Sequence, residues 1–209
     1  MILICNAFAQ GCTADWDGLG ALATTGATFA ALIVAWAEPR RRKQARREVI
    51  REACSAVDRL VAYHAIAKRL ITFDPIYVPQ LRACDRIAED ASIQSNIIDI
   101  LMHRAELSDG AIMALVAAKS IVPGLLNLKN PYGLGSNEWQ QRRIGVDAAD
   151  MSASIAAEKS ASVRKHYRWP ISTAAAAIAS GYNAMLIACE EARANNTVPV
   201  FSAVDQATC

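Results

Sequence analysis

An uncharged run near the N-terminus constrains this chain more than any other feature. Residues 18–37 contain no Asp, Glu, Lys or Arg. A helix over these twenty residues is about 30 Å long at about 1.5 Å of rise per residue, which matches the hydrocarbon thickness of a bilayer. Trp16 and Trp36 lie near its two ends, where an amphipathic indole favours the membrane interface. We therefore predict a transmembrane helix over 18–37.

The charges on either side of this run predict its orientation. Residues 1–17 contain no Lys or Arg, so a cleaved signal peptide, which needs basic residues before its apolar run, is disfavoured. The basic cluster lies on the other side and consists of Arg40, Arg41, Arg42, Lys43, Arg46 and Arg47. The positive-inside rule then places the N-terminus outside and the rest of the chain in the cytoplasm. We expect an inner or plasma membrane location, with the basic cluster contacting anionic lipid headgroups.

The composition of the run predicts that it associates with another helix. Its strongly apolar aliphatic and phenyl side chains contribute only about −2 to −4 kcal/mol to insertion, at about −0.3 to −0.6 kcal/mol each. Small residues recur every fourth position, at Ala23, Ala27, Ala31 and Ala35. This spacing lets two helices approach closely and pack by van der Waals contact. We expect a homo-oligomer or a membrane protein partner.

Composition predicts one further domain and disfavours nucleic acid as a partner. Without the basic cluster, the 22 Lys and Arg fall to 16, against 20 Asp and Glu. A mildly acidic domain lacks the basic surface that nucleic acid requires. The expected organisation is a short extracytoplasmic tail over 1–17, the span, a cytoplasmic helical bundle over 38–194 and a flexible tail over 195–209.

Apolar periodicity predicts an all-α fold in which the N-terminal span continues into a bundle of about four to five helices. The first bundle helix covers 40–72, and Pro39 either begins it or kinks its junction with the span. Its apolar seam, of coiled-coil type, comprises Ile50, Ala53, Val57, Leu60, His64, Ala67 and Ile71. Further helices are expected over 79–104, from 108 to 122, over 138–168 and over 171–194. The inward positions expected in 138–168 are Ile144, Ala148, Met151, Ile155 and Ser162.

Residues 171–189 are also free of charge and leave a second span open. Their larger side chains form one stripe, however, and this amphipathic pattern favours a bundle helix. The stripe consists of Ile171, Ala175, Ile178, Tyr182, Met185 and Cys189.

No pattern in the sequence predicts a catalytic, cofactor or metal site. Asp99, His103 and Glu106 carry ligand-type groups, but a metal would need further ligands from another helix. Residues 131–138 place two glycines before a helix, and an ordinary turn explains them better than an anion site. His64 with Lys68 resembles the pattern of histidine phosphotransfer bundles, with a longer spacing, and a seam histidine is the better interpretation.

The cysteines fall into two groups. Three lie within expected bundle helices, Cys54, Cys84 and Cys189, and are typical of small core residues in a reducing compartment. Cys5 and Cys12 would lie outside, where a disulfide is conceivable.

We therefore expect a single-pass, membrane-anchored helical protein that acts in interaction, scaffolding or signal coupling. The alternatives left open are a two-span pore or lysis-type protein and a membrane-tethered enzyme without a recognisable motif.

Overall fold

The structure is a computed structural model that describes residues 4–5, 12–13, 16–72, 78–131, 136–195 and 197, with side chains described over 23–72, 79–131, 137–195 and at 197. The chain divides into two compact units, Met1–Arg47 and Glu48–Cys209, which we describe separately. The predicted tails over 1–17 and 195–209 lie mostly outside the described residues.

In the first unit, the described backbone consists of a short strand pair and the beginning of a long helix. Strands β1 (Ile4–Cys5) and β2 (Cys12–Thr13) pair antiparallel with Cys5 opposite Cys12. Helix α1 extends from Trp16 to Thr72 and therefore contains the expected span, the basic cluster and the first bundle helix. Pro39 lies inside α1, so it does not begin a new helix.

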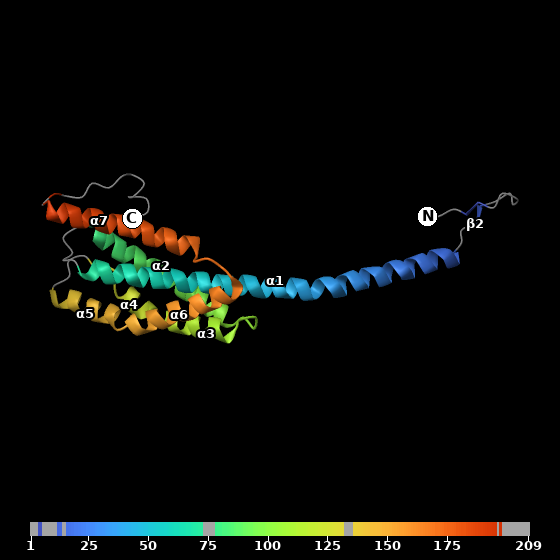
Figure 1. The fold of residues 1–209 in the computed structure, drawn as a ribbon, viewed down its shortest axis with the longest axis horizontal. Helices are drawn as coiled ribbons and strands as arrows, with labels where there is room; N and C mark the ends of the chain where they lie inside the picture. Colours follow the sequence, from blue (N-terminus) through green and yellow to red (C-terminus); the bar gives the residue numbers. More distant parts are fainter. Residues whose placement is uncertain are drawn as a thin grey trace. The chain divides into compact units, whose positions relative to one another are not determined.

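The second unit is the predicted helical bundle, and the all-α prediction is confirmed for it. After α1 come α2 (Val78–Met102), α3 (Asp109–Lys119), α4 (Val122–Leu126), α5 (Ser136–Asp147), α6 (Asp150–Tyr167) and α7 (Thr173–Ala194). Helix α3 packs against α6, and α4 packs against α2 and α5. Figure 1 shows the bundle part of α1 with α7 on one side and α5 and α6 on the other.

The predicted seam of α1 forms the centre of the core. Every one of its seven positions is buried, including His64, and Val57 and Leu60 are completely inaccessible. Around the seam lie apolar residues from the other helices, such as Ile87, Leu115 and Leu186. Spacings of three and four residues place one face of a helix against its neighbours, which is why periodicity alone predicted this core.

The prediction of one helix over 138–168 was wrong. Ala148 and Ala149 form a turn between α5 and α6, in which the amide of Ala149 donates to the carbonyl of Val146 at 3.1 Å. This tighter, three-residue bond rotates the following helix, so the inward face differs from the expected one. Met151, which follows the turn, is 76% exposed. Ile144 precedes the turn and is 67% exposed, so the turn does not account for its position. Ser162 is also exposed, whereas the buried positions of α6 are Ala153, Ala156, Ser160 and Val163.

Helices α4 and α5 approach each other closely, and this approach requires glycine at position 124 of α4. A Cβ atom at Gly124 would lie 2.7 Å from the carbonyl oxygen of Gly145. Contacts this short are prohibitive, so any larger residue would push the two helices apart. The third predicted helix, expected to reach 122, ends at Lys119 and is followed by the separate short helix α4.

Within the described residues, one helical segment has the length and apolar composition of a membrane span. It is Asp109–Leu126, with a mean hydropathy of 1.5, and 44% of it is buried inside the bundle. Leu115 and Leu125 within it are fully buried, as in the core helix of a soluble protein. This is weak evidence for a span, and residues 171–189 do not reach the same apolar composition. This segment is not N-terminal, so the finding does not support the span expected over 18–37, of which the side chains of residues 18–22 lie outside the described ones.

Candidate functional site

The first candidate site is the outer surface of α1 in the first unit. Every side chain from Ala23 to Trp36 is exposed, including large apolar ones such as Phe29 and Val34, which are 63% and 65% exposed. A continuous apolar surface of this kind is rare on proteins that stay in water. The four alanines of the predicted association stripe, Ala23, Ala27, Ala31 and Ala35, lie on this exposed surface.

One hydroxyl on this part of α1 is satisfied within the helix itself. The Thr28 hydroxyl donates to the carbonyl of Thr24 at 2.9 Å, one turn earlier. A hydroxyl that bonds to its own helix can enter hydrocarbon without leaving a donor unpaired. The described part of the uncharged run therefore combines an apolar surface with an internally bonded hydroxyl.

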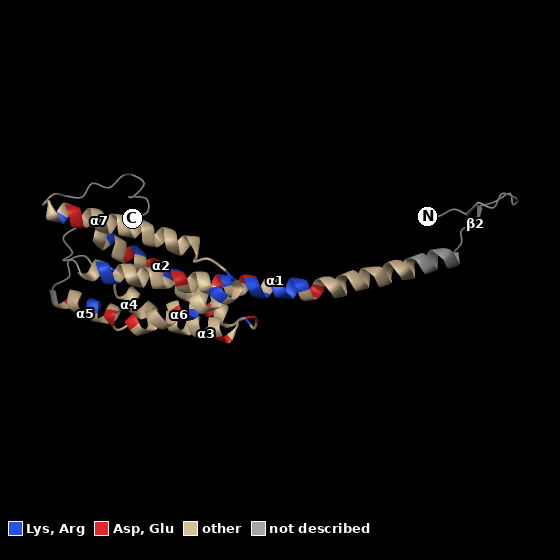
Figure 2. Ribbon diagram, viewed as in Figure 1, with Lys and Arg blue, Asp and Glu red and all other residues tan. Residues whose placement is uncertain are grey.

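The basic cluster follows directly, and its six side chains are exposed. Figure 2 shows the run of Lys and Arg along α1 in blue. The Arg40 guanidinium lies 3.7 Å from the centre of the Trp36 ring, close enough for a cation–π contact. One turn on, the Arg42 Nε donates to the Glu38 carboxylate at 2.9 Å. The aromatic ring and the first cation thus lie at the same level of the helix, where apolar sequence changes to charged sequence.

The second unit contains a buried ionic cluster that sequence reasoning missed. Asp58 of α1 is buried, and its Oδ1 accepts hydrogen bonds from the Ser160 hydroxyl at 2.8 Å and from Arg164 Nη1, both on α6. Its Oδ2 accepts a longer bond, 3.4 Å, from the backbone amide of Ser172. Ser172 is the N-cap of α7 and accepts from the amide of Ala175. Asp58 therefore joins α1 to α6 and to the beginning of α7.

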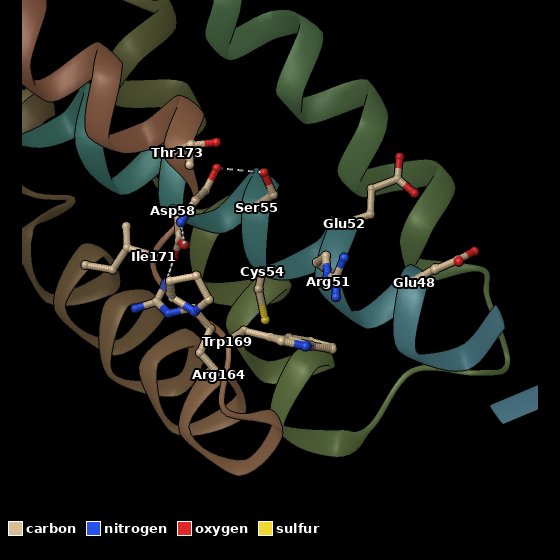
Figure 3. A pocket seen from close by; sticks show the side chains of 12 residues that line it. Glu48, Arg51, Glu52, Cys54, Ser55, Asp58, Arg164, Trp169, Ile171 and Thr173 are labelled. Atoms are coloured by element: carbon tan, nitrogen blue, oxygen red, sulfur yellow. Dashed lines mark hydrogen bonds and ion pairs between the residues drawn. The ribbon is translucent and has the colours of Figure 1, made fainter. Parts of the chain in front are cut away.

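A cleft of about 570 Å³ opens beside this cluster. One side is formed by residues 48–58 of α1, where the second unit begins. The other side is formed by residues 169–173, which connect α6 to α7. Figure 3 shows the Trp169 indole extending beneath Cys54 and Arg51. The Arg51 guanidinium lies 5.2 Å from the centre of that ring. The Tyr167 ring stacks against the Trp169 ring, with their centres 4.5 Å apart. The connection is shaped by Arg168, which adopts a left-handed conformation at the end of α6.

The thiol in this cleft is not activated for nucleophilic chemistry. Burial raises the pKa of Cys54, and this effect outweighs the opposing hydrogen bond from Ser160. A thiol with a raised pKa forms little of the reactive thiolate at neutral pH. Cys54, Cys84 and Cys189 are all buried, which confirms their prediction as core residues.

His64 is held by the junction between α5 and α6. Its Nε2 lies 3.0 Å from the carbonyl oxygen of Val146 and 3.5 Å from a carboxylate oxygen of Asp150. Lys68, one turn later on α1, forms an ion pair with the same Asp150. The two residues of the phosphotransfer-like pattern thus have structural partners, and the histidine is buried away from solvent.

The other ligand-type residues are not brought together. Helix α2 ends at Met102, so His103 and Glu106 do not continue the helical face of Asp99. The Asp99 carboxylate forms an ion pair with Lys119, and no group of three or more possible metal ligands occurs within the described residues. Within the glycine-rich segment predicted as a turn, 131–138, residues 132–135 lie outside the described ones, and helix α5 begins at Ser136.

The sequence carries a weak signal for the missed cluster. Asp58 directly follows the seam residue Val57. A carboxylate that is buried at such a position needs a hydrogen-bonding or charged partner. Ser160 and Arg164 are one turn apart on α6 and could have supplied it. Their pairing spans more than a hundred residues, so no local pattern reveals it. No protein-family model, curated protein or solved structure matches this chain.

Proposed function

We propose that this protein is a single-pass, membrane-anchored helical bundle that acts in interaction, scaffolding or signal coupling and associates with itself through its span. The observation that carries this proposal is the exposed apolar surface of α1 from Ala23 to Trp36, followed at once by the basic cluster. Contact with lipid or with a second helix can cover such a surface, whereas leaving it exposed to water has a high free-energy cost.

The arrangement of residues around Trp36 supports the orientation. Tryptophan and arginine both favour the headgroup region, and Arg40 lies against the Trp36 ring at the charged end of the run. Six cations close to an anionic leaflet contribute about 1 kcal/mol each to attachment, which adds to the thin apolar content of the span. The N-terminus then lies outside, and residues 38–194 lie in the cytoplasm.

Helix α1 also gives the proposed span a direct connection to the bundle. The same helix contains the exposed apolar surface and the buried seam from Ile50 to Ile71. A partner that changes the association of the span therefore acts on a helix that also forms the centre of the bundle core. This connection favours signal coupling or scaffolding over a passive anchor.

Native cysteines provide the test of topology. Intact cells or spheroplasts expressing the full chain are treated with a membrane-impermeant maleimide, and labelled peptides are identified by mass spectrometry. We expect labelling at Cys5 or Cys12 and none at Cys209 until the cells are permeabilised. The buried Cys84 stays unlabelled in both conditions and serves as a folding control. Labelling of Cys209 from outside, or extraction of the protein by carbonate wash without detergent, would overturn the proposal.

A further inference from the structure

The charges that line the cleft beside Trp169 leave it with an excess of one negative charge. Asp58 and Arg164 neutralise each other as an ion pair. The remaining ionisable groups of the lining are Arg51 and two carboxylates, Glu48 and Glu52. Both glutamates are exposed, and neither forms an ion pair with any described residue. The lining is therefore complementary to one added positive charge.

A cation already lies against the aromatic wall of the cleft. The Arg51 guanidinium is 5.2 Å from the centre of the Trp169 ring, within the range of a cation–π contact. Arg51 is itself exposed, so its side chain can leave the ring for solvent without creating a buried charge. Its position marks where a ligand cation would be stabilised by the ring.

The rest of the cleft suits a compact apolar group. Cys54, Pro170 and Ile171 line it, and Ile171 is 60% exposed, which is high for a branched aliphatic side chain. A volume of about 570 Å³ lies within the range of small-molecule sites, about 300–1,000 Å³. The Ser55 and Ser172 hydroxyls, also in the lining, lie 3.1 Å apart and provide further hydrogen-bonding capacity.

We propose that this cleft binds a small organic monocation that has an ammonium or guanidinium group and a compact apolar body. The cationic group replaces Arg51 over Trp169 and is neutralised by Glu48 and Glu52, while the apolar body contacts Cys54 and Ile171. The proposal goes beyond the proposed function and does not depend on membrane insertion. A chain that fails the topology test can still bind the cation. A chain that passes the topology test can likewise fail to bind it.

Three probes of matched size test the proposal: 2-phenylethylammonium, the neutral 2-phenylethanol and the anionic phenylacetate. Binding to the full chain in detergent micelles is measured by calorimetry and by saturation-transfer NMR. We expect the cation to bind with millimolar or better affinity and at least about tenfold more tightly than either of the others. Equal binding of the alcohol, preference for the anion, or no binding of the cation would overturn the proposal.

Substitutions at the rim of the cleft distinguish a site that binds cations from one that binds any apolar molecule. Arg51→Gln frees the ring and raises the negative charge of the lining, so we expect it to tighten binding of the cation by about threefold or more. Glu52→Gln should weaken binding by a similar factor. Both residues are exposed, so neither substitution disturbs the core. Arg82→Gln, on the exposed side of α2, is the matched control for loss of an arginine and should leave affinity unchanged.

Trp169→Leu should abolish the preference for the cation over the alcohol, because leucine keeps an apolar wall without the aromatic face. The far-UV circular dichroism spectrum of each variant checks that the bundle is intact. Weaker cation binding by Arg51→Gln, or an unchanged preference in a folded Trp169→Leu variant, would contradict the assignment.

Discussion

Replacing Asp58 by Asn is predicted to destabilise the bundle by about 3 kcal/mol. The substitution keeps the size of the side chain but removes the charge that Arg164 pairs with. Removing one partner of a buried ion pair costs about 3–5 kcal/mol, because the other charge remains without compensation. The Arg164 side chain is 14% exposed and that of Asp58 is 8% exposed, so some solvation of the arginine is retained and the lower end of the range applies.

Urea unfolding of the full chain in detergent, followed by circular dichroism, measures this change. With a slope of about 2 kcal/mol/M, a loss of about 3 kcal/mol lowers the midpoint by about 1.5 M. The matched control is Glu89→Gln, which removes an exposed carboxylate from α2. Asp58→Leu combined with Arg164→Met should cost much less than the sum of the single changes, because no charge is left unpaired. An effect of Asp58→Asn no larger than that of the control would refute the reasoning.

Three further predictions concern the span and the core. Replacing Ala27 and Ala31 together by Leu should improve insertion and weaken self-association in a bacterial two-hybrid or crosslinking assay; the same effect from Ala30→Leu, which lies off the stripe, would contradict the stripe. Burial and a hydrogen bond to a carboxylate raise the pKa of Tyr63 from 10.0, so its stabilising effect is present below about pH 10 and is lost as the pH rises above that value. Unfolding free energies near and above pH 10 should therefore fall more steeply in the wild type than in Tyr63→Phe. Burial raises the pKa of Cys84 to about 12, so its alkylation by iodoacetamide should follow the urea unfolding curve; rapid alkylation of the folded chain would contradict this burial.

The periodic features of the fold could be predicted because they depend on neighbouring residues. The seam of α1 and the stripe of α7 follow from spacings of three and four, and Tyr182, Met185 and Cys189 are buried as expected. Helix α3 likewise begins close to the expected start at 108, with Ser108 as its N-cap. Ile171 of the α7 stripe is exposed because the helix begins only at Thr173.

The features that were missed depend on residues far apart in the chain. The break falls at Ala148 and Ala149, although alanine favours a helix. The helix is interrupted there by tertiary packing, with His64 bound to the carbonyl of Val146. The cleft likewise exists only because the connection between α6 and α7 lies against α1, where Ser172 meets Asp58. Neither contact leaves a local pattern in the sequence.

Pro39 has a consequence for how deep α1 can lie in a bilayer. Because proline has no amide hydrogen, the carbonyl of Ala35, four residues earlier in α1, lacks its helical donor. In hydrocarbon an unpaired carbonyl costs several kcal/mol, whereas at the headgroup level water or a lipid can donate to it. In the proposed arrangement this one missing hydrogen bond favours a position of α1 in which Ala35 lies at the aqueous boundary of the membrane.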